Sequence, residues 1–312
     1  MSTPVVGRFA PTPSGFLHPG NLLCAMIAYL SVRTRGGRCL LRIEDLDRPR
    51  CPASLVRQCI SDLNFLGFRW DGPILYQSER TSAYLAQFRR LRETGQVYPC
   101  FCSRAQLHAS QAPNRGDTLY VYPGTCLTLT PTEIRQRMQE KDPAYRLHVP
   151  DISITVQDRI QGPFTADLVR NPGDFILRRA DGVFAYHLAV VTDDAESGVT
   201  EVVRGCDILT ATPSQIYLQQ LLGFPTPVYA HIPLLVDANG RRLAKRDQAV
   251  SLSALSKVYR PDEILGALAA SAGLIPEWRP CTLESLMPLF DLRRLPRTDL
   301  RLPEGFSGTS PV

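Results

Sequence analysis

The sequence predicts an α/β protein whose parallel sheet is assembled from two separated parts of the chain. Short apolar stretches alternate with helical patterns over residues 5–94, an order that is typical of parallel sheets. This alternation stops near Tyr98 and resumes at about residue 186. A chain of 312 residues is long enough for roughly two domains, or for one domain with a large insertion.

In the first part, apolar runs and helical hydrophobic spacing predict two strands and three helices. A glycine pair at residues 36–37 is expected to end the first helix. The expected strands span 5–9 and 38–43, and the expected helices span 20–34, 53–66 and 82–94.

The middle of the chain is predicted to be an insertion. Over residues 98–130, cysteine, glycine, proline and tyrosine replace hydrophobic periodicity. The elements expected after it are a helix at 132–139 and strands at 146–149, 152–157 and 175–178.

The α/β pattern returns in the last third of the chain. We expect a helix from about 186, a strand at 199–203, a helix at 214–222, a strand at 228–231 and a hairpin-like turn at Asn239-Gly240. Small helices are expected after Pro261 and disorder from Leu302. The predicted organisation is 1–97 and 185–256 for the two halves of the α/β domain, 98–184 for the insertion, and 257–312 for a short helical segment with a disordered tail.

Composition limits the class of protein. No apolar run approaches the ~20 residues that cross a bilayer, and the N-terminus does not resemble a secretory signal, so we expect a cytoplasmic protein without a membrane partner. Nine cysteines, an odd number, fit reduced thiols better than a disulfide framework. The basic residues are mostly arginine, which makes a loop lysine such as Lys245 stand out.

Two short motifs predict contacts with phosphate. A loop rich in proline and glycine runs into a helix at Gly20, where backbone N–H groups and the positive helix end favour an anion. His18 can donate a hydrogen bond there, although spacing alone favours a histidine that simply caps the helix. The second motif is the basic loop around Lys245, whose simpler interpretation is a solvated turn.

Together the two motifs resemble the HIGH and KMSKS signatures of class I aminoacyl-tRNA synthetases, at residues 18–21 and 242–246. Four further stretches, in family order, are similar to the catalytic core of glutamyl-tRNA synthetases: residues 8–15, 42–47, 186–189 and 198–205. The resemblance implies a class I split Rossmann fold, with an inserted zinc-bearing subdomain of the acceptor-binding type and a short helical C-terminal segment.

The signatures are not complete. Asn21 stands where the first motif has its second histidine, and Arg242 stands for the first lysine of the second motif. Ala244 and Arg246 replace the two serines, so hydroxyl groups near the phosphates are lost, while the central cation, Lys245, is kept.

The resemblance also implies which residues bind substrates. His18 and Lys245 would be catalytic, through positioning and charge stabilisation rather than a covalent intermediate. ATP, with Mg²⁺, would contact His18, Gly20, Asn21, Arg242 and Lys245. Glutamate would be bound by Arg8, Phe9, Ala10, Pro11, Thr12, Glu44, Tyr186 and Arg204.

Each charged pocket residue has a plain structural alternative. Glu44 can hold the substrate ammonium group, or it can pair with Arg42 or Arg48. Arg204 can bind a carboxylate or pair with Glu201. Which arginine would take the side-chain carboxylate of glutamate stays open.

The insertion offers a candidate metal site. Cys100, Cys102 and Cys126 supply three thiols, and unpaired loop cysteines are the alternative. A structural Zn²⁺ is favoured because little else would hold an aperiodic segment together. The stretch resembles the C-x-C…Y-x-x-x-C zinc site of some glutamyl-type enzymes, which implies Tyr122 as fourth ligand, and His108 is the chemically more ordinary alternative.

About 55 residues follow the Lys245 loop, too few for the anticodon-binding domain of full-length family members. This implies the truncated branch of the family, which activates glutamate without tRNA and transfers it to the queuosine base at the wobble position of tRNA-Asp. Val190, where full-length enzymes often have asparagine, fits that branch. The alternatives are a minimal enzyme that charges the 3′ end of tRNA-Glu, and a silent zinc-bearing RNA-binding paralogue. A monomer is expected.

Overall fold

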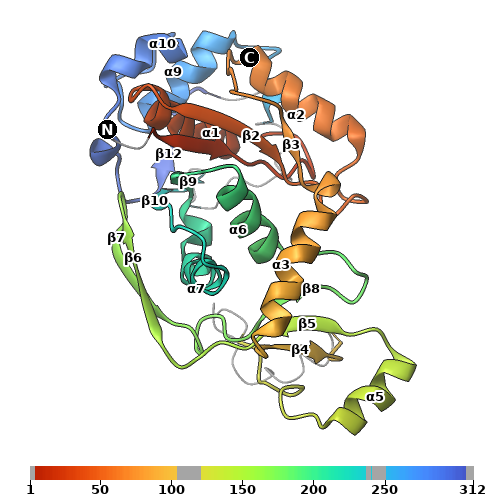
Figure 1. The fold of residues 1–312 in the computed structure, drawn as a ribbon. Coiled ribbons are helices and arrows are strands. Elements are labelled where there is room, and N and C mark those ends of the chain that lie inside the picture. Colours follow the sequence, from red (N-terminus) through yellow and green to blue (C-terminus); the bar gives the residue numbers. More distant parts are fainter. Residues whose placement is uncertain (1–3, 104–120, 237–239, 241–250, 307–312) are drawn as a thin grey trace.

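The computed structural model describes residues 4–103, 121–236, 240 and 251–306. Within these ranges, no helix is both long enough and apolar enough to span a membrane. Figure 1 shows the predicted two-part α/β arrangement in the upper part of the molecule and the insertion below it.

The central parallel sheet joins the two halves of the catalytic domain. One set of parallel strands has the order β1-β2-β3, and β9 pairs with β10, also in parallel. The two sets meet where Thr200, just before β9, donates its backbone N–H to the carbonyl of Val6 in β1 at 2.8 Å. The strands are β1 (Val6–Phe9), β2 (Arg38–Ile43), β3 (Leu75–Tyr76), β9 (Glu201–Gly205) and β10 (Val228–Ile232).

Close packing at this junction depends on Gly7. A Cβ atom at this position would lie 2.5 Å from Cγ2 of Val32 in the covering helix and 3.6 Å from the carbonyl oxygen of Glu201. Any side chain here would therefore separate the helix from the sheet at the seam between the halves.

Helices cover the sheet and bury its apolar faces. The helix after β1 is buried nearly all round, and Leu22, Met26 and Leu30 are fully buried in the main core. The helices of the catalytic domain are α1 (Pro19–Arg33), α2 (Ala53–Phe65), α3 (Thr81–Glu93), α6 (Tyr186–Glu196) and α7 (Thr212–Leu222), with short 3₁₀ helices at Gln77–Glu79 and Cys206–Ala211.

In the part that the structure describes, the insertion contains an antiparallel sheet of order β4-β5-β8, the helix α5 and a separate hairpin. The hairpin reaches back to the catalytic half, because the N–H of Arg159 at its turn donates to the carbonyl of Tyr229 in β10 at 2.9 Å. Its elements are β4 (Val97–Cys100), α5 (Pro131–Glu140), β5 (Ala144–Leu147), β6 (Ser153–Asp158), β7 (Gly162–Asp167) and β8 (Phe175–Arg178).

The C-terminal segment packs onto the catalytic domain rather than trailing from it (Figure 1). Its last short strand pairs in parallel with the strand that precedes the Lys245 loop. The elements are β11 (Leu235–Val236), α8 (Leu252–Leu255), α9 (Pro261–Ser271), α10 (Leu283–Leu286) and β12 (Leu300–Arg301), with 3₁₀ helices at Met287–Leu289 and Leu292–Arg294.

The predicted fold class is confirmed, and the differences lie in weakly patterned segments. Strands β3, β4, β7, β11 and β12 have no counterpart among the predicted elements. The expectation of disorder from Leu302 is wrong for the residues up to Phe306, whose ring stacks on Tyr259 at 4.8 Å and is 5% exposed. Of the predicted turn at Asn239-Gly240, Asn239 lies outside the described residues, and the three predicted domain boundaries stay predictions.

Candidate active site

The loop after β1 presents the start of α1 to a cleft. Nδ1 of His18 accepts the backbone N–H of Gly20 at 3.2 Å, and Oδ1 of Asn21 accepts the N–H of His18 at 3.3 Å. His18 therefore caps the helix, as its simpler interpretation predicts. Because Nδ1 accepts, the ring proton belongs on Nε2, which makes this edge of the ring a donor.

Most of the predicted substrate-binding residues line one cleft of about 520 Å³ at the carboxyl ends of β1, β2, β9 and β10. Such an edge of a parallel sheet, combined with a helix N-terminus, is where α/β domains bind nucleotides. Arg8 lies outside the lining, and Arg242, Lys245 and His108 lie outside the described residues. The predicted residues in the lining are Phe9, Ala10, Pro11, Thr12, His18, Gly20, Asn21, Glu44, Tyr186 and Arg204.

Arg204 supplies a buried cation to this cleft. Its Nε donates to Nε2 of His231 at 2.9 Å and its Nη2 donates to Oγ1 of Thr212 at 2.7 Å. Among the described residues, Nη1 is buried without a hydrogen-bond partner. The alternative pairing with Glu201 is not found, since that carboxylate accepts from Ser31 and Arg35. Arg204 is thus 4% exposed with one donor unused, which suits an incoming carboxylate.

A buried chain of side chains holds Arg204 in place. Nδ1 of His231 lies 2.6 Å from Oδ2 of Asp158, which ends β6 of the insertion hairpin. Since Nε2 of His231 accepts from Arg204, its proton belongs on Nδ1. Burial lowers the pKa of His231, with Arg204 adding to the effect and Asp158 opposing it, so the ring is neutral at pH 7.

Sequence reasoning missed Asp158 and His231. A histidine inside the apolar strand at 228–232 was the available signal, because a polar group buried in a sheet needs a partner. Its partner lies 73 residues earlier in the chain, however, so no spacing rule could identify it.

Arg8, in β1, is held by a network of buried ion pairs. Its Nε donates to Oδ1 of Asp194 at 3.1 Å, and its Nη1 donates to the carbonyl of Val203 at 3.3 Å. Nη1 of Arg42 shares the same oxygen of Asp194 at 2.5 Å. Burial alone would raise the pKa of Asp194, but Arg42 and Arg8 hold it below its ordinary value.

Glu44 joins this network to the cleft. Its Oε1 accepts from Nη2 of Arg42 at 3.3 Å, and Oγ1 of Thr12 donates to Oε2 at 3.4 Å. The pairing with Arg42 is therefore present, while Arg48 donates to the carbonyl of Ser78 instead. Burial raises the pKa of Glu44, so a bound ammonium group would compensate a partly desolvated carboxylate.

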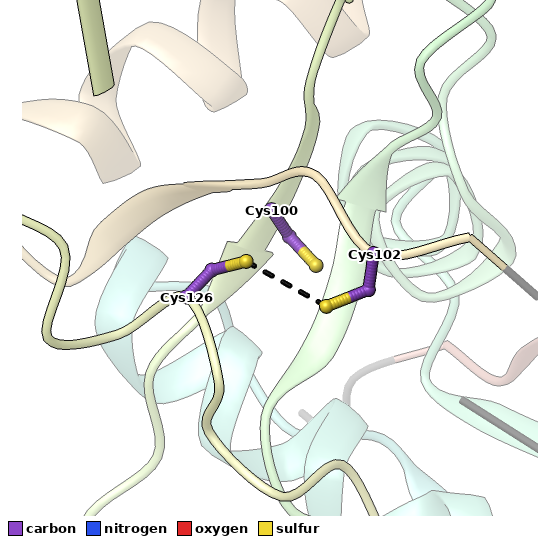
Figure 2. Close-up of side chains that lie close together, drawn as sticks. All are labelled: Cys100, Cys102 and Cys126. Atoms are coloured by element: carbon purple, nitrogen blue, oxygen red, sulfur yellow. Dashed lines mark hydrogen bonds between the residues drawn. The ribbon is translucent and has the colours of Figure 1, made fainter. Parts of the chain in front are cut away.

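The predicted metal ligands come together in the insertion. Figure 2 shows the three thiols of Cys100, Cys102 and Cys126 converging, and their sulfur atoms all lie within 4.8 Å of one another. The hydroxyl of Tyr122 lies 3.5 Å from Sγ of Cys100 and 3.6 Å from Sγ of Cys102. It also accepts the N–H of Cys126 at 2.9 Å. Three sulfurs and one oxygen around a common point are a donor set that could hold a metal ion.

The guanidinium group of Arg146 lies next to the cluster and favours the thiolate form of Cys100. Nε of Arg146 donates to Sγ of Cys100 at 3.3 Å, and its guanidinium lies 3.8 Å from the ring centre of Tyr122. Burial raises the pKa of Cys100, but its hydrogen bonds with Tyr122 and Arg146 outweigh burial and bring that pKa below its ordinary value. Arg146 thus favours the thiolate form of Cys100, whereas burial raises the pKa of Cys102 to about 11.

The family described as tRNA synthetases class I (E and Q), catalytic domain, matches residues 4–274. The chain belongs to this family, which confirms the resemblance predicted from its motifs and implies the use of ATP.

Relatives with higher sequence identity to the chain carry a more specific name than the family. The chain is 46% identical, over 95% of both chains, to the glutamyl-Q tRNA(Asp) synthetase of Symbiobacterium thermophilum. It is 49% identical to the protein of the same name from Thiobacillus denitrificans, over 79% of both chains. Among solved structures, the glutamate-tRNA synthetase of Elizabethkingia anophelis has a TM-score of 0.85 at 26% identity, covering 97% of this chain and 68% of that one.

Proposed function

We propose that this protein activates glutamate with ATP in the absence of tRNA and transfers it to the queuosine base at the wobble position of tRNA-Asp. The relatives named glutamyl-Q tRNA(Asp) synthetase support this proposal, because their identity of 44–49% extends over most of the chain. A reaction on tRNA that consumes ATP belongs in the cytoplasm, where we expect the protein to act as a monomer.

The single observation that carries the proposal is the buried, unused donor Nη1 of Arg204 in a cleft that also contains Glu44. An amino acid with a second carboxylate needs a cation for that carboxylate and an anion for its ammonium group. Arg204 and Glu44 supply these from opposite halves of the domain. We assign the side-chain carboxylate of glutamate to Arg204, with Tyr186 and the backbone of residues 9–12 forming the wall.

In the first step, an α-carboxylate oxygen of glutamate attacks the α-phosphorus of ATP, and pyrophosphate leaves. His18 would donate from Nε2 to a phosphate oxygen at the start of α1, and Gly20 lets the nucleotide approach the backbone. Asn21 would keep His18 oriented through the capping hydrogen bond. Lys245 and Arg242 would neutralise the charge of the leaving pyrophosphate.

Arg8 would act through the positive potential of its guanidinium group and by fixing the position of β9. It forms an ion pair with Asp194 and hydrogen-bonds the carbonyl of Val203, the residue before Arg204. We propose that Arg8 adds positive potential behind the pocket and fixes the end of β9, rather than contacting the glutamate side chain directly.

We further propose that the thiol cluster holds one structural Zn²⁺, bound by Cys100, Cys102, Cys126 and Tyr122. Zn²⁺ would tie the segment after β4 to the segment before α5. The position of the Tyr122 hydroxyl between two sulfurs supports Tyr122 as fourth ligand. Metal analysis of the purified protein tests this, with one zinc per chain as the expected value.

Glutamate-dependent ATP–pyrophosphate exchange, measured with and without tRNA, tests the activity. Exchange without tRNA, followed by transfer of labelled glutamate to queuosine-containing tRNA-Asp that lacks its 3′ end, is the expected result. The structural similarity to a glutamate-tRNA synthetase favours a second candidate activity, the charging of the 3′ end of tRNA-Glu. Exchange that requires tRNA-Glu would establish that candidate instead.

A further inference from the structure

A second cleft adjoins the glutamate pocket and is not used in activation. It encloses about 650 Å³ between the catalytic domain and the insertion. Thr12, Glu44 and Tyr186 line both clefts, so their side chains form a shared wall. A molecule in the second cleft would therefore lie directly beside a glutamyl group held by Glu44 and Arg204.

The second cleft has an apolar interior. Leu46 comes from the loop after β2, Ile176 from β8, and Val183 and Phe184 from the turn before α6. Phe184 is held by edge-to-face contacts with the rings of α3, at 5.9 Å from that of Tyr84. Such a rigid apolar wall suits the flat face of a nucleobase, which RNA-binding proteins hold by stacking and apolar contact.

Charged side chains line the same cleft. Nη1 of Arg179 lies 3.5 Å from Oδ2 of Asp47, and its Nη2 lies 2.5 Å from Oδ2 of Asp181. One guanidinium thus bridges a carboxylate of the catalytic domain and a carboxylate of the insertion. Carboxylates accept hydrogen bonds from vicinal hydroxyl groups, as they do from the ribose of bound dinucleotides.

We infer that the second cleft binds the acceptor nucleoside, with its base against the apolar wall and its vicinal diol towards Asp47 and Asp181. This inference rests on the proposed function, since it needs an activated glutamyl group next door. The volume falls within the range of small-ligand sites, which is about 300–1,000 Å³. A base in this cleft must be unstacked from its neighbours, as in other enzymes that act on a base.

In this cleft the acceptor nucleoside lies where it can react with the glutamyl adenylate. One hydroxyl oxygen of the diol attacks the carbonyl carbon of the glutamyl adenylate, and the bond from that carbon to the phosphate oxygen breaks. AMP leaves with the bonding electron pair, and the hydroxyl proton passes to a phosphate oxygen of AMP. The products are a glutamyl ester and AMP.

Two acceptors share this chemistry: the cyclopentene diol of queuosine and the terminal ribose of a tRNA. Two RNA substrates distinguish them. The first is the queuosine-containing anticodon stem-loop of tRNA-Asp, an RNA that has no acceptor stem. The second is full-length tRNA-Glu without queuosine.

The test compares activation with transfer in cleft variants. Asp47→Asn and Asp181→Asn keep side-chain shape but remove the charge, and Val183→Trp fills the interior. We expect single-turnover transfer of labelled glutamate to the stem-loop to fall about 10-fold in each asparagine variant and about 100-fold in Val183→Trp. Exchange without tRNA should stay within about twofold of wild type in all three, because glutamate and ATP bind in the first cleft. Glu277→Gln, an exposed carboxylate in the C-terminal segment, is the matched control.

The outcomes separate this inference from the proposed function. Normal transfer by all three variants would overturn the second cleft as acceptor site, and so would a parallel loss of exchange and transfer. If wild type labels only tRNA-Glu and the variants reduce that labelling, the cleft stands with a terminal ribose in it and the queuosine proposal fails. Transfer to neither RNA by an enzyme that shows exchange would overturn both.

Discussion

The substrate cleft and the thiol cluster are built in opposite ways. Cys100, Cys102, Tyr122 and Cys126 come from one segment of the chain, and their spacing together with the family resemblance predicted the cluster. The cleft takes Glu44 from the first half and Arg204 from the second. Glu44 is held through Arg42, which pairs with Asp194, and Arg204 is held through His231, which pairs with Asp158. A site whose residues all come from one short segment can be predicted from the sequence. In a site assembled from several segments, only the residues that belong to a motif can be predicted.

The largest effect should come from breaking the ion network behind the cleft. In Asp194→Asn, Arg8 and Arg42 lose their common carboxylate while remaining buried. Removing one partner of a buried ion pair costs about 3–5 kcal/mol, so we expect a loss of this size in the free energy of unfolding. Urea denaturation measures it, with Asp291→Asn in the C-terminal segment as control. A loss below about 1 kcal/mol would contradict a structural role for this network.

His18→Asn should come next, and its effect should be catalytic. Asparagine is a good N-cap, so the helix keeps its start, but the ring donor at Nε2 disappears. We expect the exchange rate at saturating glutamate and ATP to fall about 10²–10³-fold, as when one transition-state donor is removed. Steady-state exchange kinetics measure this, and Lys257→Ala is the control. A variant with weaker substrate binding but normal turnover would show that His18 serves binding alone.

Removing a ligand from the cluster should affect the insertion and spare the cleft. In Cys126→Ser we expect zinc content to fall well below one per chain, and hydrogen exchange of residues 97–103 and 121–147 to speed up about 10-fold or more. ATP–pyrophosphate exchange should change less than about threefold. Cys206→Ser, a thiol outside the cluster, is the control. Equal loss of exchange activity would mean that the two regions depend on each other.

The smallest effect tests one contact between the insertion and the cleft, that of the hairpin with His231. In Asp158→Asn, the amide keeps the size of the side chain but cannot accept all the hydrogen bonds that the carboxylate accepts. We expect Arg204 to be less well held, with the KM for glutamate rising about 10-fold and kcat for exchange nearly unchanged. Thr155→Val, on the exposed face of the same hairpin, is the control. An unchanged KM would show that Arg204 is positioned without the hairpin.

Much of the fold could be predicted because its strong elements have strong local patterns. The boundaries of β2 and β8 coincide with the predicted strands at 38–43 and 175–178. Strand β7 was missed because its exposed, polar sequence has little hydrophobic alternation. Strand β12 was missed because two residues become a strand only by pairing with β11, which lies 65 positions earlier.

By itself, the sequence determined the fold class and the family, and it predicted which groups would carry the chemistry: the capped helix at His18, the acid Glu44, the cation Arg204 and the thiols of the insertion. The fold class follows from local periodicity, and the family and the predicted groups follow from short motifs and from the resemblance that they carry. Only the tertiary structure decided that Arg8 faces Asp194, that His231 and Asp158 hold Arg204, and that a second cleft shares a wall with the first. The physical reason is that a buried charge is stabilised by whichever opposite charge or dipole the fold brings near it, and sequence separation places no limit on that partner.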